Sequence, residues 1–119
     1  MLIDGLIFTD DEDKVIFNHH SFCELIKHIM VKYAGKTFEE ADLLVRNSFL
    51  MNEPESYDHV VFYTHELQFH WAMLIAHGDM YWLKGIPSDY NDFNDSYLTW
   101  EKDIMTQYNI KESYQYIEF

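Results

Sequence analysis

The sequence predicts a mainly α-helical single domain, residues 1–119, built as a helical bundle around one long central helix. Three observations predict it: two capping boxes that each precede an apolar stripe, a four-three apolar repeat from Val60 to Leu74, and the length of the chain. At 119 residues the chain is long enough for one core and short for two. Hydrophobic residues make up 48% of it, with only four Gly and two Pro, so it is expected to fold rather than to remain disordered.

The opening segment carries short apolar runs at residues 2–8 and 15–17, on either side of an acidic turn at residues 10–13. Two such runs across a polar turn are typical of a small β-hairpin. An α+β domain is therefore the alternative to the helical bundle.

Two helices are expected next, each beginning at a capping box. Ser21 and Glu24 have the spacing of a capping box, and the helix they begin is expected to end at Gly35. Thr37 and Glu40 repeat the pattern, and the apolar stripe that follows is expected to continue until the segment before Pro54.

The long central helix is expected from Ser56, a capping residue, to Gly78, where a left-handed residue can end it. Residues 80–83 are ambiguous between strand and helix. One further helix is expected over residues 96–108, where aromatic and aliphatic side chains recur at helical spacing: Tyr97, Trp100, Ile104 and Tyr108.

The charge balance indicates what the protein binds. Asp and Glu number 21 against 8 Lys and Arg, which gives a formal net charge of −13. Direct binding to nucleic acid or to an anionic membrane surface needs Lys and Arg, so a basic partner is expected instead. The single cysteine, Cys23, cannot form an internal disulfide, which fits a cytoplasmic protein. No targeting or membrane-spanning segment is expected.

Catalytic and metal-binding patterns are weak. Glu66, His70 and His77 could support a metal-dependent hydrolase, but they do not form a recognisable ligand motif. Cys23 is interpreted as a core residue because no base accompanies it. We therefore expect no enzyme, no metal site and no cofactor.

A window of acids and aromatic residues at 88–103 is the candidate binding site. Acids can steer a cationic partner, and Tyr and Trp are enriched where binding energy concentrates. The residues expected to bind the partner are Asp89, Tyr90, Asp92, Asp95, Tyr97, Trp100, Glu101 and Asp103. The alternative is a solvated loop whose rings enter the core. Two other acidic sites are possible interfaces, the turn at residues 10–13 and the helix start with Glu39, Glu40 and Asp42.

The chain resembles the small acidic immunity proteins of bacterial contact-dependent growth inhibition systems. The resemblance is carried by its size, its −13 charge, its acidic and aromatic surface, and residues 66–73 and 77–82, which read ELQFHWAM and HGDMYW. It implies a protein that binds the C-terminal nuclease domain of a toxin, commonly a tRNA nuclease or another RNA or DNA nuclease with a basic active-site cleft, and blocks that active site without chemistry. A phage-type acidic mimic of nucleic acid, which disarms a defence nuclease, is the other binding hypothesis. Neither resemblance nor composition indicates the oligomeric state.

Overall fold

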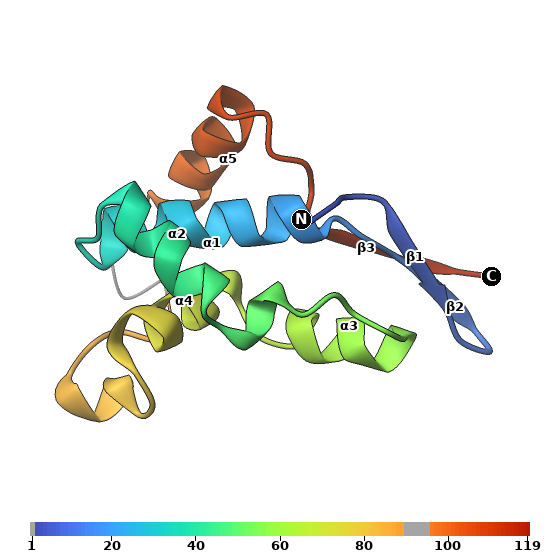
Figure 1. Ribbon diagram of the computed structural model, residues 1–119. Helices are drawn as coiled ribbons and strands as arrows, with labels where there is room; N and C mark the ends of the chain where they lie inside the picture. The colour runs from blue at the N-terminus through green and yellow to red at the C-terminus, as the bar shows by residue number, and fades with distance from the viewer. Residues whose placement is uncertain (1, 90–95) are drawn as a thin grey trace.

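The computed structural model describes residues 2–89 and 96–119, and within them the protein is a mixed α+β fold (Figure 1). The predicted mainly α-helical bundle is wrong, and the α+β alternative is the one observed. A three-stranded antiparallel sheet stands at one end, and the helices occupy the rest of the molecule. The elements are β1 (Leu6–Thr9), β2 (Asp13–Phe17), α1 (His19–Tyr33), α2 (Phe38–Arg46), the 3₁₀ turn η1 (Phe49–Met51), α3 (Tyr57–Thr64), α4 (Gln68–His77), the 3₁₀ turn η2 (Tyr81–Lys84), α5 (Tyr97–Gln107) and β3 (Tyr114–Glu118).

The predicted N-terminal hairpin is confirmed. β1 and β2 pair antiparallel from Leu6 opposite Phe17 to Thr9 opposite Lys14. The Asp10 carboxylate closes the turn between them, because its Oδ1 accepts hydrogen bonds from the main-chain N–H groups of Glu12 (2.9 Å) and Asp13 (2.7 Å).

The C-terminal strand β3 was not predicted. It pairs with the other edge of β2, so β2 is the central strand in the order β1-β2-β3. A five-residue strand has no local partner to reveal it: β3 forms only when the fold brings it to a strand about a hundred positions earlier in the chain.

The helix at the centre of the core is α1, which runs from the sheet through the middle of the molecule (Figure 1). Its buried face packs against α2, α4 and α5. The fully buried apolar side chains on that face are Phe22, Cys23, Leu25, Ile26, Ile29 and Met30.

The predicted long central helix over residues 56–78 is wrong, because the chain breaks between α3 and α4. Ser56 caps α3 as expected, with Oγ accepting from His59 N at 3.2 Å. At the break, side chains contact carbonyl groups of the last turn of α3, which a continuous helix would have bonded. Trp71 Nε1 donates to Tyr63 O at 2.8 Å, and the His65 ring nitrogen Nδ1 lies within hydrogen-bond distance of Phe62 O. The turn buries Trp71 and leaves Leu67, a predicted member of the apolar stripe, 44% exposed.

Only one of the two predicted capping boxes is present. Thr37 and Glu40 form one at the start of α2: Thr37 Oγ1 accepts from Glu40 N at 3.1 Å, and Glu40 Oε1 accepts from Thr37 N at 2.8 Å. The box at Ser21 is wrong, since α1 begins earlier, at His19. Ser21 instead donates both its main-chain N–H and its Oγ–H to the Asp4 carboxylate, at 2.9 and 2.8 Å. A carboxylate from the N-terminal segment therefore caps α1.

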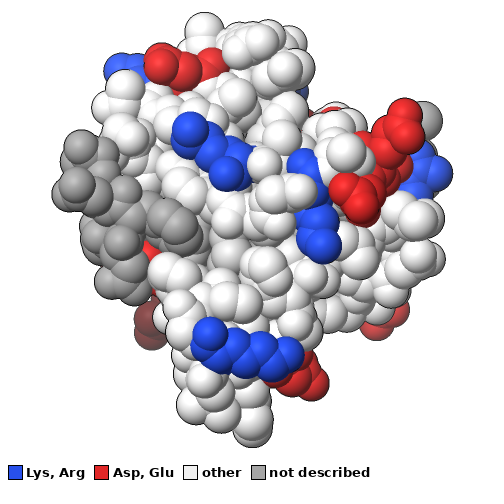
Figure 2. All heavy atoms as spheres, turned by 90° about the vertical axis from the view of Figure 1, so that its left-hand side faces the viewer, with Lys and Arg blue, Asp and Glu red and all other residues white. Residues whose placement is uncertain are grey.

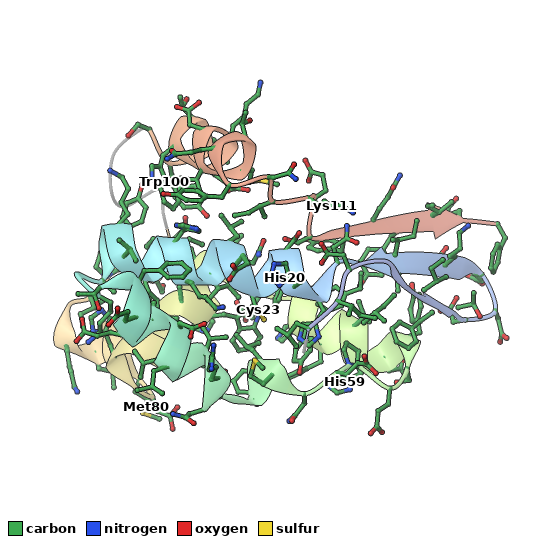
Figure 3. The ribbon with its side chains drawn as sticks, turned by 45° about the horizontal axis from the view of Figure 1, so that its top comes forward. His20, Cys23, His59, Met80, Trp100 and Lys111 are labelled. Carbon is green, nitrogen blue, oxygen red and sulfur yellow. The ribbon has the colours of Figure 1, made fainter. Side chains whose placement is uncertain are left out.

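The remaining helical expectations are met in part. α5 lies within the predicted residues 96–108. α2 ends earlier than predicted, at Arg46, and a short 3₁₀ turn follows it. After α5 the chain returns to the start of α1, where Lys111 N donates to Ser21 Oγ at 3.0 Å, and Figure 3 labels Lys111 and His20 at this junction.

Candidate functional site

Three residues of the predicted binding window lie outside the described residues: Tyr90, Asp92 and Asp95. Asp89 is half-buried, and Asp103 is exposed on α5. The prediction that this window binds a partner stays a prediction.

The predicted aromatic anchors of the window face inward. Tyr97 is only 5% exposed, and its ring centroid lies 5.7 Å from that of Tyr33 and 5.9 Å from that of Phe69. Trp100 is half-buried with its ring edge-on to Tyr33, at 5.4 Å. Both rings pack in or against the core, which fixes α5 on α1 and leaves little ring surface for a partner.

Glu101, the acid next to these rings, also lies partly inside the protein. Glu101 is half-buried, and burial raises the pKa of its carboxyl group, although a hydrogen bond from Tyr97 acts in the opposite direction. Glu101 is therefore a weaker source of surface charge than its sequence context indicates.

At the helix start with Glu39, Glu40 and Asp42, most of the carboxylates are engaged by contacts within the protein. Hydrogen bonds from the main chain and side chain of Thr37 lower the pKa of Glu40. Asp42 makes ion pairs with Lys27 Nζ and Arg46 Nε, each at 2.8 Å, and the Lys27 hydrogen bond is the main cause of its lowered pKa. Two of the three acids are therefore already bonded or ion-paired.

The acidic turn at residues 10–13 is different, because the fold adds more acid and aromatic side chains to it. The N-terminus of α3 and the end of β3 both lie beside the hairpin: the Tyr57 hydroxyl donates to Asp13 Oδ2 at 3.3 Å, and Phe119 N donates to Glu12 O at 3.0 Å. We call this surface the hairpin end. Its residues are Asp10, Asp11, Glu12, Asp13, Tyr57, Tyr116, Glu118 and Phe119.

The hairpin end places like charges against each other. Asp13 and Glu118 are directly opposite across β2 and β3, an arrangement that destabilises a sheet. Lys14, the neighbouring cation, is directed to the other face of the sheet because successive side chains of a strand alternate. Among residues 2–89 and 96–119, no Lys or Arg forms an ion pair with an acid of the hairpin end.

Aromatic rings accompany these acids. Tyr116 is 38% exposed and Phe119 is 74% exposed. The Tyr57 ring lies edge-on to Tyr116 at 5.9 Å. Burial, together with the charges of Asp10 and Asp13, raises the pKa of Tyr57 to about 12, so it remains a hydrogen-bond donor at physiological pH.

The opposite end of the molecule carries a different charge pattern. Figure 2 faces that end and shows Lys and Arg side chains spaced across a largely uncharged surface, with acids mainly at its margins. At the last residue of α4, His77, burial lowers the pKa, and the nearby charges of Lys36 and Lys84 add to the effect. Negative charge is therefore unevenly distributed over the molecule.

The residues of the hydrolase alternative are held by other contacts or remain at the surface. His70 Nδ1 is 2.8 Å from the Tyr81 hydroxyl, and Glu66 is exposed. Within the part of the chain that the structure describes, no three or more His, Cys, Asp or Glu side chains are grouped as metal ligands would be. Cys23 is buried, and burial raises the pKa of its thiol to about 12.

Comparisons with protein-family models, with curated proteins and with solved structures find no match to this chain. In the described residues, no helix combines the length and the apolar character needed to cross a membrane.

Proposed function

We propose that this protein is an immunity-type inhibitor that binds the basic nuclease domain of a toxin through its hairpin end and blocks it without chemistry. The observation that carries the proposal is the opposed pair Asp13 and Glu118 beside the exposed rings of Tyr116 and Phe119. Residues that break a local rule of stability, such as like charges in register, are expected at functional sites. A cationic partner would relieve this repulsion.

The chemistry of nucleases supports this assignment of the partner. A nuclease presents Lys and Arg to phosphate groups, so a surface of carboxylates can occupy the same cleft. Complementary charge accelerates association, up to about 10⁸–10⁹ M⁻¹s⁻¹ at low salt. Rings that become buried on binding, such as Phe119, would then slow dissociation.

A phage-type mimic of nucleic acid is the second candidate, and the same acidic surface favours it. The two differ in breadth: a mimic competes for any nuclease with a basic cleft, whereas an immunity protein protects against one toxin. An RNase domain is the expected target of the immunity protein, and a defence nuclease is that of the mimic.

The proposal is tested by producing the protein together with the C-terminal domain of a toxin encoded beside its gene. The wild-type protein is expected to restore growth and to bind the purified domain, with association that slows as salt rises. The double variant Asp11→Asn/Glu12→Gln removes two exposed charges of the hairpin end. We expect it to slow association about tenfold or more.

A matched control removes two charges elsewhere. Asp89→Asn/Asp103→Asn neutralises acids of the predicted window and should leave association much less affected. If this control slows association more than the hairpin variant does, the interface is the window. If the wild-type protein neither binds the toxin domain nor protects cells, the inhibitor proposal fails. Protection against several unrelated nucleases would favour the mimic.

A further inference from the structure

A cavity of about 390 Å³ lies between α1, the first residue of α2 and the segment after α5, and the inhibitor proposal does not use it. Its size falls within the range of small-molecule sites. His20 of α1, labelled in Figure 3, is one of its lining residues. Asn109, in a left-handed conformation with φ of 56°, turns the chain so that both Tyr108 and Ile110 line the cavity.

One wall of the cavity is a cluster of three rings, in which Tyr108 is stacked on His28 and Phe38 is tilted against it. The His28 ring lies 4.3 Å from Tyr108 at an interplanar angle of 30°, and 5.1 Å from Phe38. The outer rings are accessible, with Phe38 41% and Tyr108 53% exposed. Burial lowers the pKa of His28, so the ring cluster is uncharged at neutral pH. The faces of such rings attract cations.

The polar side of the cavity is acidic. Asp4 and Glu24 are among its lining residues, and neither Lys nor Arg is. The Asp4 carboxylate already accepts two hydrogen bonds from Ser21, so Glu24 is the acid expected to contact a ligand. Lys27 does not line the cavity and shares its charge between Glu24 Oε2 (2.7 Å) and Asp42 Oδ1 (2.8 Å). Its Nζ also lies 5.9 Å from the centroid of the Phe38 ring, so that ring already faces a cation and Tyr108 is the ring left for a ligand. Glu24 Oε1 is 4.0 Å from His20 Nε2, which is beyond hydrogen-bond distance. This oxygen is therefore an acceptor to which no described residue donates.

We propose that this cavity binds a guanidinium group, with its N–H groups donating to Glu24 and its plane against the exposed ring of Tyr108. A guanidinium is planar, always charged and suited to both contacts at once, whereas an ammonium cannot stack. The ligand is either a free small guanidine or an Arg side chain of a bound protein. This site is independent of the hairpin end, so the guanidinium proposal and the inhibitor proposal are tested by separate experiments.

The test is a titration of the purified protein with n-propylguanidine, followed by the amide signals in ¹H–¹⁵N NMR spectra. Saturable shifts are expected at residues around the cavity. The neutral isostere n-propylurea has nearly the same shape without the charge and should bind about tenfold more weakly or not at all. Equal binding of the urea, or shifts that do not map to the cavity, would overturn the proposal.

Two variants test the two contacts separately. Glu24→Gln removes the charge of the acceptor, and Tyr108→Ala removes an exposed ring whose loss the fold should tolerate. Each should weaken n-propylguanidine about tenfold. Glu55→Gln, an exposed acid that does not line the cavity, is the control and should not weaken it. If Glu55→Gln has the same effect as Glu24→Gln, only the net charge matters and the site is wrong.

A blocked peptide, acetyl-Gly-Arg-Gly-amide, distinguishes the two sources of the guanidinium group. Binding as strong as that of n-propylguanidine assigns the cavity to an Arg side chain of a partner protein. Binding of n-propylguanidine alone assigns it to a free small molecule, because the peptide backbone would then clash with the rim.

Discussion

Removing the like-charge pair at the hairpin end should stabilise the free protein. Asp13 and Glu118 are opposite each other in the sheet, and Glu118 is exposed. Cross-strand charge pairs contribute about 0.2–1 kcal/mol, with a sign set by the charges. Glu118→Gln keeps the shape of the side chain and removes the repulsion, so we expect a gain of about 0.5 kcal/mol. Glu118→Lys converts the repulsion into attraction and should gain about 1 kcal/mol.

Urea unfolding of the three proteins at low and high salt measures this effect. The gain should be largest at about 0.05 M salt and should shrink toward 1 M, where the Debye length falls to about 3 Å. The slope of the unfolding free energy against urea should stay constant, so that the midpoint alone reports stability.

The opposite outcome would refute the reasoning. If Glu118→Gln is less stable than the wild type, Glu118 makes a favourable contact that outweighs the repulsion. If its gain is the same at both salt concentrations, the effect is not electrostatic. The same variant should associate more slowly with the proposed nuclease partner, since it trades function for stability.

Three further predictions concern the core. Trp71→Phe removes the indole donor to Tyr63 O and should lower the free energy of unfolding in urea by about 1–3 kcal/mol. Trp71→Ala also leaves a cavity and should lower it by about 3–5 kcal/mol. A loss below about 1 kcal/mol for Trp71→Ala would contradict the observed burial of this side chain. Burial lowers the pKa of His19 from 6.5, so the unfolded chain binds a proton at this side chain more readily than the folded protein does. The folded protein should therefore have its full stability above about pH 6.5 and lose part of it as the pH falls below that value. His19→Gln should flatten the pH dependence of urea unfolding in that range. Burial raises the pKa of Cys23 to about 12, so a thiol reagent at about pH 8 should react only as fast as the protein unfolds, and rapid modification of the folded protein would contradict this burial.

The sequence alone determined the features that depend on residues a few positions apart. The capping box at Thr37 and the cap at Ser56 are hydrogen bonds within one turn of helix, and both are confirmed. The hairpin across residues 10–13 is equally local, because its strands are adjacent in the chain. The net charge of −13 likewise follows directly from the amino-acid composition.

Interactions between distant residues decided the features that the sequence pattern missed. Asp4 caps α1 from the N-terminal segment, which makes the predicted box at Ser21 unnecessary. Trp71 bonds to Tyr63 across the break between α3 and α4, and no Gly or Pro marks that break in the sequence. β3 exists only because β2 offers it an edge.

The same division applies to the candidate sites. The sequence determined which carboxylates and rings the protein has, but not which of them remain free for a partner. Tyr97 looked like a binding anchor and is buried in the core, while Asp42 is ion-paired with Lys27. The hairpin end became the strongest candidate only when the fold set Glu118 opposite Asp13. Burial and Coulomb energies depend on distance in space, and separation along the chain does not report that distance.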